Sequence, residues 1–343
     1  MYQQYFGLRE LPFDLTPNPR YLFLTHQHRE ALSTLVYGLS TGKGLTLLIG
    51  EVGTGKTTLL HAALQSDKCR HVMTINVTNP TLTRQEFFEL LAVQLELSAN
   101  ATRSKAAFLT ELNVLLRERR QRGQVTAIVV DEAQSLSAKL LEEIRLLANN
   151  ETSTAKLLAL VLAGQPELRD RLNTPELRQL KQRVTLRSEL VPFSLNDTAA
   201  YIATRIRVAG GEAWRVFTRE AVTVIHQRSG GIPRTINVIC DNALMTGLAL
   251  GKQPVDVATV MEVVRDFDLP ALAFADDEEE PAALPAERPA ETLAEKLVEN
   301  LAETPTSEPV LGPASIELTP TPADDAPPSA DAPPRRFSVL GSR

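Results

Sequence analysis

The chain has 343 residues, of which 43% are hydrophobic, and a net charge of −6. This length exceeds one average domain and allows a sizeable hydrophobic core. No stretch approaches the roughly 20 apolar residues of a membrane span, and the first residues lack a secretory pattern, so we expect a cytoplasmic protein. The two cysteines, Cys69 and Cys240, lie outside any spacing typical of zinc or redox sites.

Residues 1–192 alternate short apolar runs with helical patterns, which predicts an α/β domain with a parallel sheet between helices. The expected strands are residues 44–49, 71–76, 126–130, 157–163 and 184–190. Leucines recur at helical spacing near residues 27–40, 56–66, 83–97, 105–120 and 137–148. Thr83 and Glu86 form a capping box that marks the start of the third of these helices.

After Pro192 the strand pattern stops, and residues 193–268 predict a small all-helical domain. Its expected helices are residues 196–208, 218–228, 233–250 and 257–266. Residues 271–343 hold 15 acidic and 5 basic side chains and 12 of the 22 prolines. This composition predicts a disordered acidic tail over residues 269–343. The remaining 31 basic and 27 acidic residues leave room for a basic binding surface on the folded part.

The strongest motif is a P-loop, which we define as residues 50–57, between a predicted strand and a predicted helix. Its glycines allow backbone N–H groups to face phosphates, and the helix N-terminus adds a favourable dipole. We expect Lys56 to neutralise the β- and γ-phosphates of ATP and the Thr57 hydroxyl to bind Mg²⁺. The predicted nucleotide-binding residues of this segment are Gly50, Glu51, Val52, Gly53, Thr54, Gly55, Lys56, Thr57 and Thr58.

Two carboxylates, Asp131 and Glu132, follow the apolar strand at residues 126–130. We expect Asp131 to hold Mg²⁺ through water, as the second metal partner beside Thr57. Glu132 is suited to orient and polarise the attacking water. An acidic pair in this position is typical of NTPases that hydrolyse their nucleotide.

Three weaker features follow along the chain. Gln165 ends a predicted strand, where its amide could touch the γ-phosphate or the water, although a plain turn is the alternative. Arg178 and Arg183 precede the fifth strand, and surface arginines in isolation carry little weight. Arg234 begins a helix after Gly-Gly-Ile-Pro and could reach phosphate across the interdomain cleft, or be solvated.

Together these motifs resemble the AAA+ ATPase family typified by general secretion pathway protein A (ExeA), over roughly residues 1–268. The resemblance also includes Tyr5-Phe6-Gly7-Leu8, Pro12-Phe13, Leu15-Thr16-Pro17-Asn18-Pro19, Asp131-Glu132-Ala133-Gln134, Gly164-Gln165-Pro166-Glu167-Leu168, Gln182-Arg183 and Gly230-Gly231-Ile232-Pro233-Arg234-Thr235-Ile236-Asn237. It implies that an N-terminal segment, around Pro12 and Phe13, lies near the adenine. It assigns Walker A to Lys56 and Thr57, Walker B to Asp131 and Glu132, sensor 1 to Gln165, an arginine finger to Arg183 and sensor 2 to Arg234.

The resemblance implies an ATP hydrolase that forms a homo-oligomer, as a ring or filament, and acts on a protein partner of a secretion or envelope assembly system. Longer members of this family carry a membrane span and a peptidoglycan-binding region after the ATPase, whereas here an acidic tail takes their place. We therefore expect no direct membrane insertion, and a peripheral position at the inner membrane only through partners. A DNA-associated ATPase is the alternative, supported by the basic run at residues 117–122. A nucleotide-gated scaffold is disfavoured by Glu132.

Overall fold

The computed structural model describes residues 1–267, except residues 17, 79–80 and 154. The predicted acidic tail at residues 269–343 lies outside these described residues. No helix in the described part of the chain is long and apolar enough to cross a membrane.

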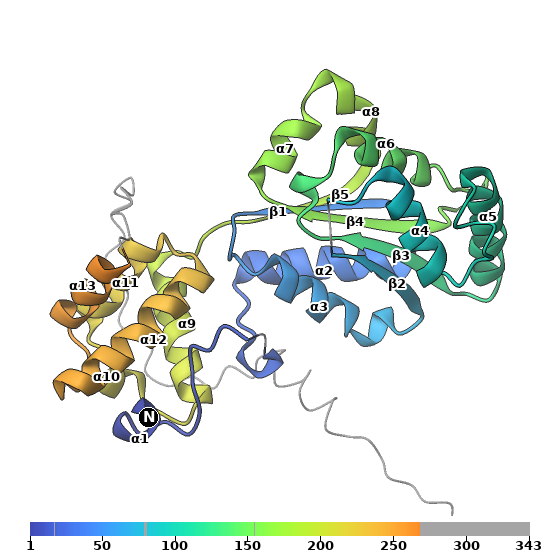
Figure 1. Ribbon diagram of the computed structural model, residues 1–343. Helices are drawn as coiled ribbons and strands as arrows, with labels where there is room; N and C mark the ends of the chain where they lie inside the picture. The colour runs from blue at the N-terminus through green and yellow to red at the C-terminus, as the bar shows by residue number, and fades with distance from the viewer. Residues whose placement is uncertain (17, 79–80, 154, 268–343) are drawn as a thin grey trace, which may run out of the picture. The chain divides into compact units, whose positions relative to one another are not determined.

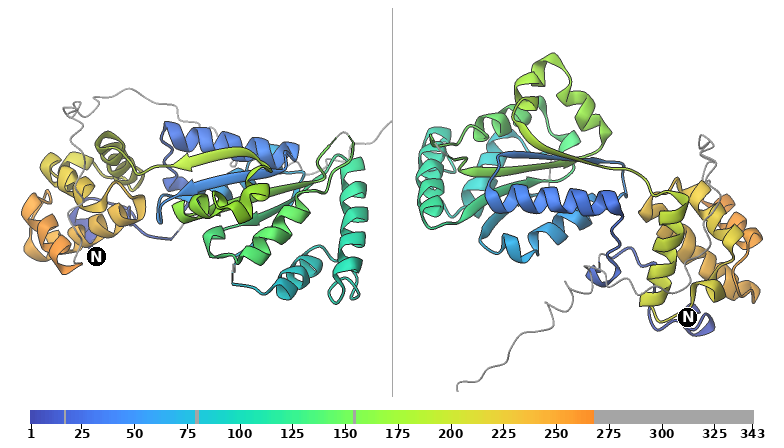
Figure 2. Two further views of the ribbon diagram at one scale, coloured as in Figure 1. Left: turned by 90° about the horizontal axis from the view of Figure 1, so that it is seen from above. Right: turned by 180° about the vertical axis from the view of Figure 1, so that it is seen from behind.

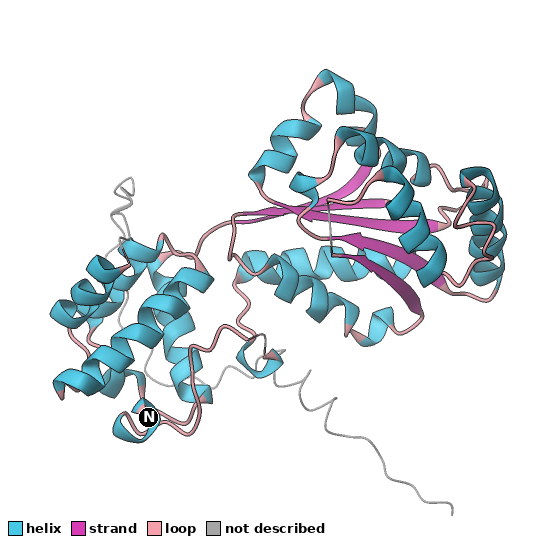
Figure 3. Ribbon diagram, viewed as in Figure 1, coloured by secondary structure: helices cyan, strands magenta, loops and turns pink. Residues whose placement is uncertain are grey.

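A five-stranded parallel sheet forms the centre of the first region (Figure 3). Its strands, in chain order, are β1 (Leu45–Gly50), β2 (Val72–Val77), β3 (Val125–Val130), β4 (Leu158–Gly164) and β5 (Val184–Leu190). Their order across the sheet is β2-β3-β4-β1-β5. Every residue of β1, β3 and β4 is buried, as expected for parallel strands that are covered on both faces. The predicted parallel sheet is therefore confirmed.

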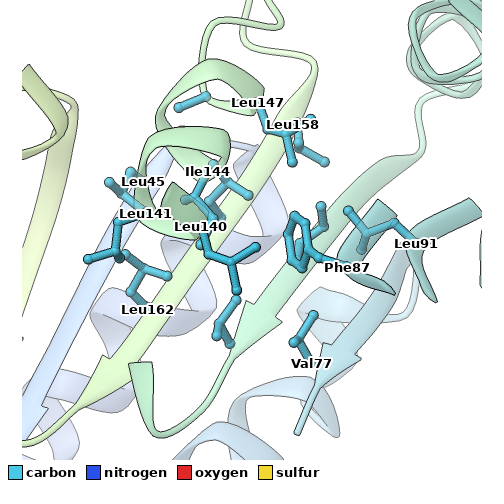
Figure 4. Packing of buried hydrophobic residues seen from close by; sticks show 14 of the residues in the cluster. Leu45, Val77, Phe87, Leu91, Leu140, Leu141, Ile144, Leu147, Leu158 and Leu162 are labelled. Atoms are coloured by element: carbon cyan, nitrogen blue, oxygen red, sulfur yellow. The ribbon is translucent and has the colours of Figure 1, made fainter. Parts of the chain in front are cut away.

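Helices cover both faces of this sheet (Figures 1 and 2). One face carries α2 (His26–Thr41) and α3 (Lys56–Leu64), and the other carries α4 (Arg84–Gln94), α5 (Lys105–Gln121) and α6 (Ala138–Leu147). Figure 4 shows Phe87 and Leu91 of α4 and Leu140 and Ile144 of α6 packed against the strands. The predicted capping box is confirmed, because Thr83 and Glu86 exchange side-chain and backbone hydrogen bonds at the start of α4.

The sequence did not predict several short elements. They are the helices α1 (Tyr2–Tyr5), α7 (Pro166–Leu172), α8 (Arg178–Lys181) and α10 (Ala213–Val216), and the 3₁₀ turns η1 (Pro19–Tyr21), η2 (Asp67–Cys69), η3 (Ala133–Ser135) and η4 (Pro175–Leu177). Each is too short to establish a helical periodicity in the sequence.

A second hydrophobic core lies among the helices that follow β5. These are α9 (Leu195–Val208), α10, α11 (Arg219–Ser229), α12 (Pro233–Leu250) and α13 (Val257–Asp266). Apolar residues of the N-terminal segment, including Phe6 and Phe13, are buried in the same core, and the Phe13 ring lies 6.2 Å from that of Phe217. The first residues therefore pack with the helical region, although the division at residue 192 places them in the α/β domain. Their few aromatic residues form too short a pattern to reveal this partner.

Candidate nucleotide-binding site

The P-loop connects the end of β1 to the start of α3. Gly53 and Gly55 adopt left-handed backbone conformations, with φ of 83° and 97°, which cost little for glycine alone. A Cβ atom at Gly53 would also lie only 2.8 Å from the Cβ of Arg234 at the start of α12. Glycine at this position therefore serves both the turn and the close approach of the helical region.

Lys56 lies beneath the loop, with 5% of its surface exposed. Its Nζ donates hydrogen bonds of 2.9 Å to the backbone carbonyls of Gly50 and Glu51. Burial lowers the pKa of Lys56, while the carboxylates of Glu132 and Asp131 act in the opposite direction. An ammonium group has three donors, so one N–H remains for a ligand.

Thr57 and Asp131 meet although 74 positions separate them in the sequence. The Thr57 hydroxyl donates a 2.6 Å hydrogen bond to Asp131 Oδ2. Hydroxyl and carboxylate oxygens are hard ligands that fit Mg²⁺, which is usually held by one or two carboxylates together with phosphates and waters. The described residues include no cluster of three or more His, Cys, Asp or Glu that could hold a metal ion by itself.

Glu132 has an unusual backbone conformation beside this pair. Its φ of 53° lies in the left-handed region, which costs a residue with a side chain about 1–3 kcal/mol and is frequent at functional sites. Glu132 Oε2 accepts hydrogen bonds from Gln134 Nε2 at 2.6 Å and from Gln165 Nε2 at 3.2 Å. The Gln134 bond is the main cause that lowers the pKa of Glu132, followed among the lowering causes by the Gln165 bond and the charge of Lys56, against the effect of burial. The carboxylate is therefore ionised at neutral pH, as a proton acceptor must be.

Arg234 reaches the P-loop from the helical region. Its backbone N–H donates a 3.3 Å hydrogen bond to the carbonyl of Gly53, and its side chain lines the same cavity as Lys56 and Thr57. Pro233 occupies the first turn of α12, where the missing N–H is not needed. The start of α12 is thereby joined to the P-loop.

Comparisons with known proteins agree with this geometry. The AAA domain family matches residues 39–172. General secretion pathway protein A of Aeromonas hydrophila is 43% identical over 259 residues, which cover 74% of this chain and 46% of that protein. The chain belongs to the AAA+ ATPases that resemble general secretion pathway protein A.

Other relatives are more distant. An uncharacterised HTH-type transcriptional regulator of Methanocaldococcus jannaschii is 25% identical over 162 residues, or 46% of this chain and 39% of that protein. The chain thus spans less than half the length of the curated relatives that it matches. Among solved structures, Cdc6p of Pyrobaculum aerophilum (TM-score 0.54, 16% identity, 74% of this chain and 70% of that chain) is similar in fold. A chain of Drosophila ORC bound to DNA also matches (TM-score 0.57, 19% identity, 76% and 65%).

A cavity of about 390 Å³ lies at this AAA+ site. Its volume falls within the range of about 300–1,000 Å³ that is typical of small-molecule pockets. Its walls come from residues 14–16, 18, 21–24, 28, 52–59, 132, 193, 201, 205, 233, 234 and 237. Residues 14–16, from the N-terminal segment that was expected near the adenine, line it, whereas Pro12 and Phe13 themselves do not. Phe13 is instead buried against Phe217, because its apolar ring completes the helical core.

Sequence reasoning missed His28, which contacts the P-loop from α2. Its Nε2 lies 3.1 Å from the backbone carbonyl of Thr54, and its Nδ1 lies 2.8 Å from Thr25 Oγ1. A carbonyl only accepts, so we place the ring hydrogen on Nε2 and let the Thr25 hydroxyl donate to Nδ1. Burial lowers the pKa of His28, which favours this neutral form. A lone histidine in a helix carries no sequence signal for such a contact.

A second group missed by sequence reasoning centres on Arg205 of α9, which is buried in the cavity wall. Its guanidinium lies 4.7 Å from the centre of the Tyr21 ring, and its Nη1 donates to Tyr201 Oη at 2.7 Å. Its Nε donates to the carbonyl of Pro12, and its Nη2 to that of Asp14 at 3.3 Å. These partners come from segments far apart in the sequence, so no local pattern predicts them.

Arg183 lies away from this cavity, whereas the other predicted residues outside its lining each contact a residue that lines it; they are Gly50, Glu51, Asp131 and Gln165. It precedes β5, whose first residue pairs with Leu45 at the start of β1, whereas the P-loop follows the end of β1. A six-residue strand rising about 3.3 Å per residue places Arg183 about 20 Å from the P-loop of its own chain. The pKa of Glu151, near the start of β4, is lowered mainly by Lys156 and to a smaller degree by Arg183.

Proposed function

We propose that this chain is a Mg²⁺-dependent ATP hydrolase that drives a conformational change or assembly step in a secretion or envelope protein machinery. The observation that carries the hydrolytic part is the position of Glu132. Its carboxylate is ionised and held by two amides beside the Thr57–Asp131 pair and Lys56. The likeness to general secretion pathway protein A supports the secretion setting.

The roles of the residues follow from their positions. Lys56 and the N–H groups of the P-loop bind the β- and γ-phosphates, and Glu132 accepts a proton from the attacking water. Thr57 and Asp131 hold Mg²⁺, which neutralises charge on the phosphates when it is bound. Gln165 contacts Glu132 at 3.2 Å, and we assign the role of γ-phosphate sensor to it on this ground.

The contact between Arg234 and Gly53 supports the coupling of nucleotide to conformation. Because the start of α12 is hydrogen-bonded to the P-loop, a shift of that loop around phosphate moves the helical region as well. Arg234 supplies a further positive charge at the cavity. We assign the phosphate-sensing role to it on these grounds.

Arg183 completes the active site of a neighbouring copy in this proposal. It is too far from its own P-loop to touch the γ-phosphate, and a homo-oligomer, as a ring or filament, brings it to the next site. Arg178, exposed at the start of α8, is the second candidate. A cytoplasmic location, with access to the inner membrane through its partners, belongs to the same proposal, because ATP is available in the cytoplasm.

A DNA-associated function remains the second candidate, and one observation favours it. Arg117, Arg120 and Arg122 are exposed at the end of α5, and none of them forms an ion pair with a carboxylate in the described part of the chain. Phosphate contacts by such arginines produce affinity that falls steeply with salt. Salt-dependent DNA binding that is lost in an Arg120→Glu and Arg122→Glu double variant would support this function over the first.

The ATPase test uses two substitutions with different expected defects. Lys56→Ala should abolish tight ATP binding, because it removes the charge beneath the phosphates. Glu132→Gln should bind ATP but hydrolyse it about 10²–10⁴-fold more slowly, since only the proton acceptor is lost. Phosphate release is measured with Mg²⁺ and with excess EDTA. Normal turnover by Glu132→Gln would show that Glu132 has no part in the mechanism. Turnover in excess EDTA would show that hydrolysis does not require Mg²⁺.

A further inference from the structure

Gln134 is a polar residue of the site to which the proposed mechanism gives no role. It lies in the turn η3, two residues after Glu132, and is half-buried. The side-chain amino group, the side-chain oxygen and the backbone carbonyl of Gln134 all form hydrogen bonds. Its Nε2 donates to Glu132 Oε2 at 2.6 Å, and its Oε1 accepts from the backbone N–H of Gln165 at 3.1 Å. Its backbone carbonyl accepts from Arg171 Nη1 of α7.

The atoms around the Gln134 side chain leave it little space for any other conformation. A Cβ atom at Gly164 would lie 3.0 Å from Gln134 Oε1 and 2.8 Å from Leu168 Cδ2. The end of β4 therefore needs a glycine where the Gln134 amide passes over it. The amide is positioned between the end of β3, which carries Glu132, and the end of β4, which carries Gln165.

The two amides that hold Glu132 are not equivalent. Gln134 forms the shorter bond to the carboxylate, at 2.6 Å against 3.2 Å for Gln165. Gln134 also fixes the backbone of Gln165 through a separate bond. If the Gln165 side chain turns towards a γ-phosphate, its backbone stays anchored and Glu132 keeps its stronger partner.

We infer that Gln134 is a positioning residue that holds Glu132 Oε2, so that Oε1 faces the attacking water, and leaves the Gln165 side chain free to sense the γ-phosphate. This inference rests on the proposed hydrolase function. Gln134 acts on the chemical step alone, because it lies neither in the P-loop nor in the wall of the cavity. Its removal should therefore lower kcat and leave nucleotide affinity unchanged.

The test uses the full-length protein with Gln134→Met, which keeps the length of the side chain and removes both side-chain hydrogen bonds, to Glu132 and to the Gln165 N–H. Gln134→Glu is the second variant, since it retains an acceptor for the Gln165 N–H but loses the donor to Glu132. Gln85→Leu is the matched control, because it removes a 2.8 Å bond of the same kind, from the exposed Gln85 Nε2 to Glu89, on α4 and away from the site. The readouts are kcat, the Kd for a fluorescent ATP analogue and the melting temperature.

For both Gln134 variants we expect kcat to fall about ten- to a hundredfold, which is less than the loss of the base itself, with Kd within about twofold of the parent. Gln85→Leu should match the parent. Adding Gln134→Met to Glu132→Gln should cause no further loss, because a residue that acts through Glu132 has nothing left to position. A purely structural role would instead lower the rate in both backgrounds by the same factor.

Three results would overturn the inference: an unchanged kcat in Gln134→Glu, a Kd that rises as much as kcat falls, or additive losses in the double variant. These results differ from a failure of the proposed function itself. If ATP hydrolysis by the parent does not depend on Lys56, the hydrolase proposal fails and the role of Gln134 fails with it. If hydrolysis depends on Lys56 and any of the three results appears, only the role of Gln134 is wrong.

Discussion

The distance between Arg183 and the P-loop leads to a mixing experiment. Because about 20 Å of strand separates them, the proposed function has Arg183 act on hydrolysis in the site of another copy. Arg183→Ala should therefore lower kcat on the order of 10³-fold, the effect of removing an arginine finger, while Kd for ATP stays near that of the parent. Lys56→Ala should be inactive for the separate reason that it does not bind ATP tightly.

Mixing the two inactive proteins should restore activity. A productive interface joins an Arg183→Ala subunit, which has an intact P-loop, to a Lys56→Ala subunit, which has an intact Arg183. In a head-to-tail oligomer mixed at equal amounts, one of the four neighbour pairings is productive, so about a quarter of the parent rate is expected. The assay is phosphate release at a protein concentration at which the parent assembles. A mixture as inactive as its components, or a fully active Arg183→Ala protein, would refute the assignment, and Arg178→Ala would be tested next.

Three further predictions concern the walls of the site. Burial lowers the pKa of His28 and of His226, so the unfolded chain takes up protons before the folded chain as the pH falls below about 6.5, the ordinary histidine value. The free energy of unfolding, measured with urea, should therefore fall below that pH by at most about 1.4 kcal/mol per pH unit for each histidine. The fall should be less steep in His28→Gln. An equal slope in His28→Gln would contradict this. Gly53→Ala should weaken ATP binding, because the new Cβ meets Arg234, whereas Gly123→Ala, also at positive φ but with nothing within 4 Å, should bind normally in the same titration. Arg205→Met should lower stability by about 1–3 kcal/mol, because the buried carbonyl of Pro12 is left without a donor, and an unchanged urea midpoint would show that water replaces the guanidinium.

The sheet and the long helices could be predicted because their patterns are local. Continuous apolar runs mark the strands, and each predicted strand lies within one residue of the observed one, as for residues 71–76 and Val72–Val77. The P-loop and the Asp131-Glu132 pair were recognisable for a related reason, since their chemistry requires particular residue types at fixed spacing. Their catalytic roles remain predictions that the experiments above test.

The walls of the site could not be predicted because they depend on tertiary contacts. Arg205 contacts Pro12 and Asp14 across about 190 positions of sequence, and His28 contacts Thr54 across 26. Neither contact leaves a periodic or compositional trace. Gln134 was visible as part of the Asp-Glu-Ala-Gln run, but its bridge to the backbone of Gln165 depends on the neighbouring positions of β3 and β4 in the sheet.

The segment between Phe13 and His28 connects the helical core to the α/β region. At its first end, Phe13 is buried in the helical core and Arg205 holds the carbonyls on either side of it. At its other end, His28 holds the P-loop carbonyl of Thr54. Between these anchors the segment lines the cavity. Under the proposed function, a nucleotide in the cavity would contact the P-loop, the helical region and the segment that joins them, and a change in the γ-phosphate would reach α9 by this connection as well as α12 through Arg234. In that case, two such links would make the orientation of the helical region depend on the nucleotide more strictly than either link alone.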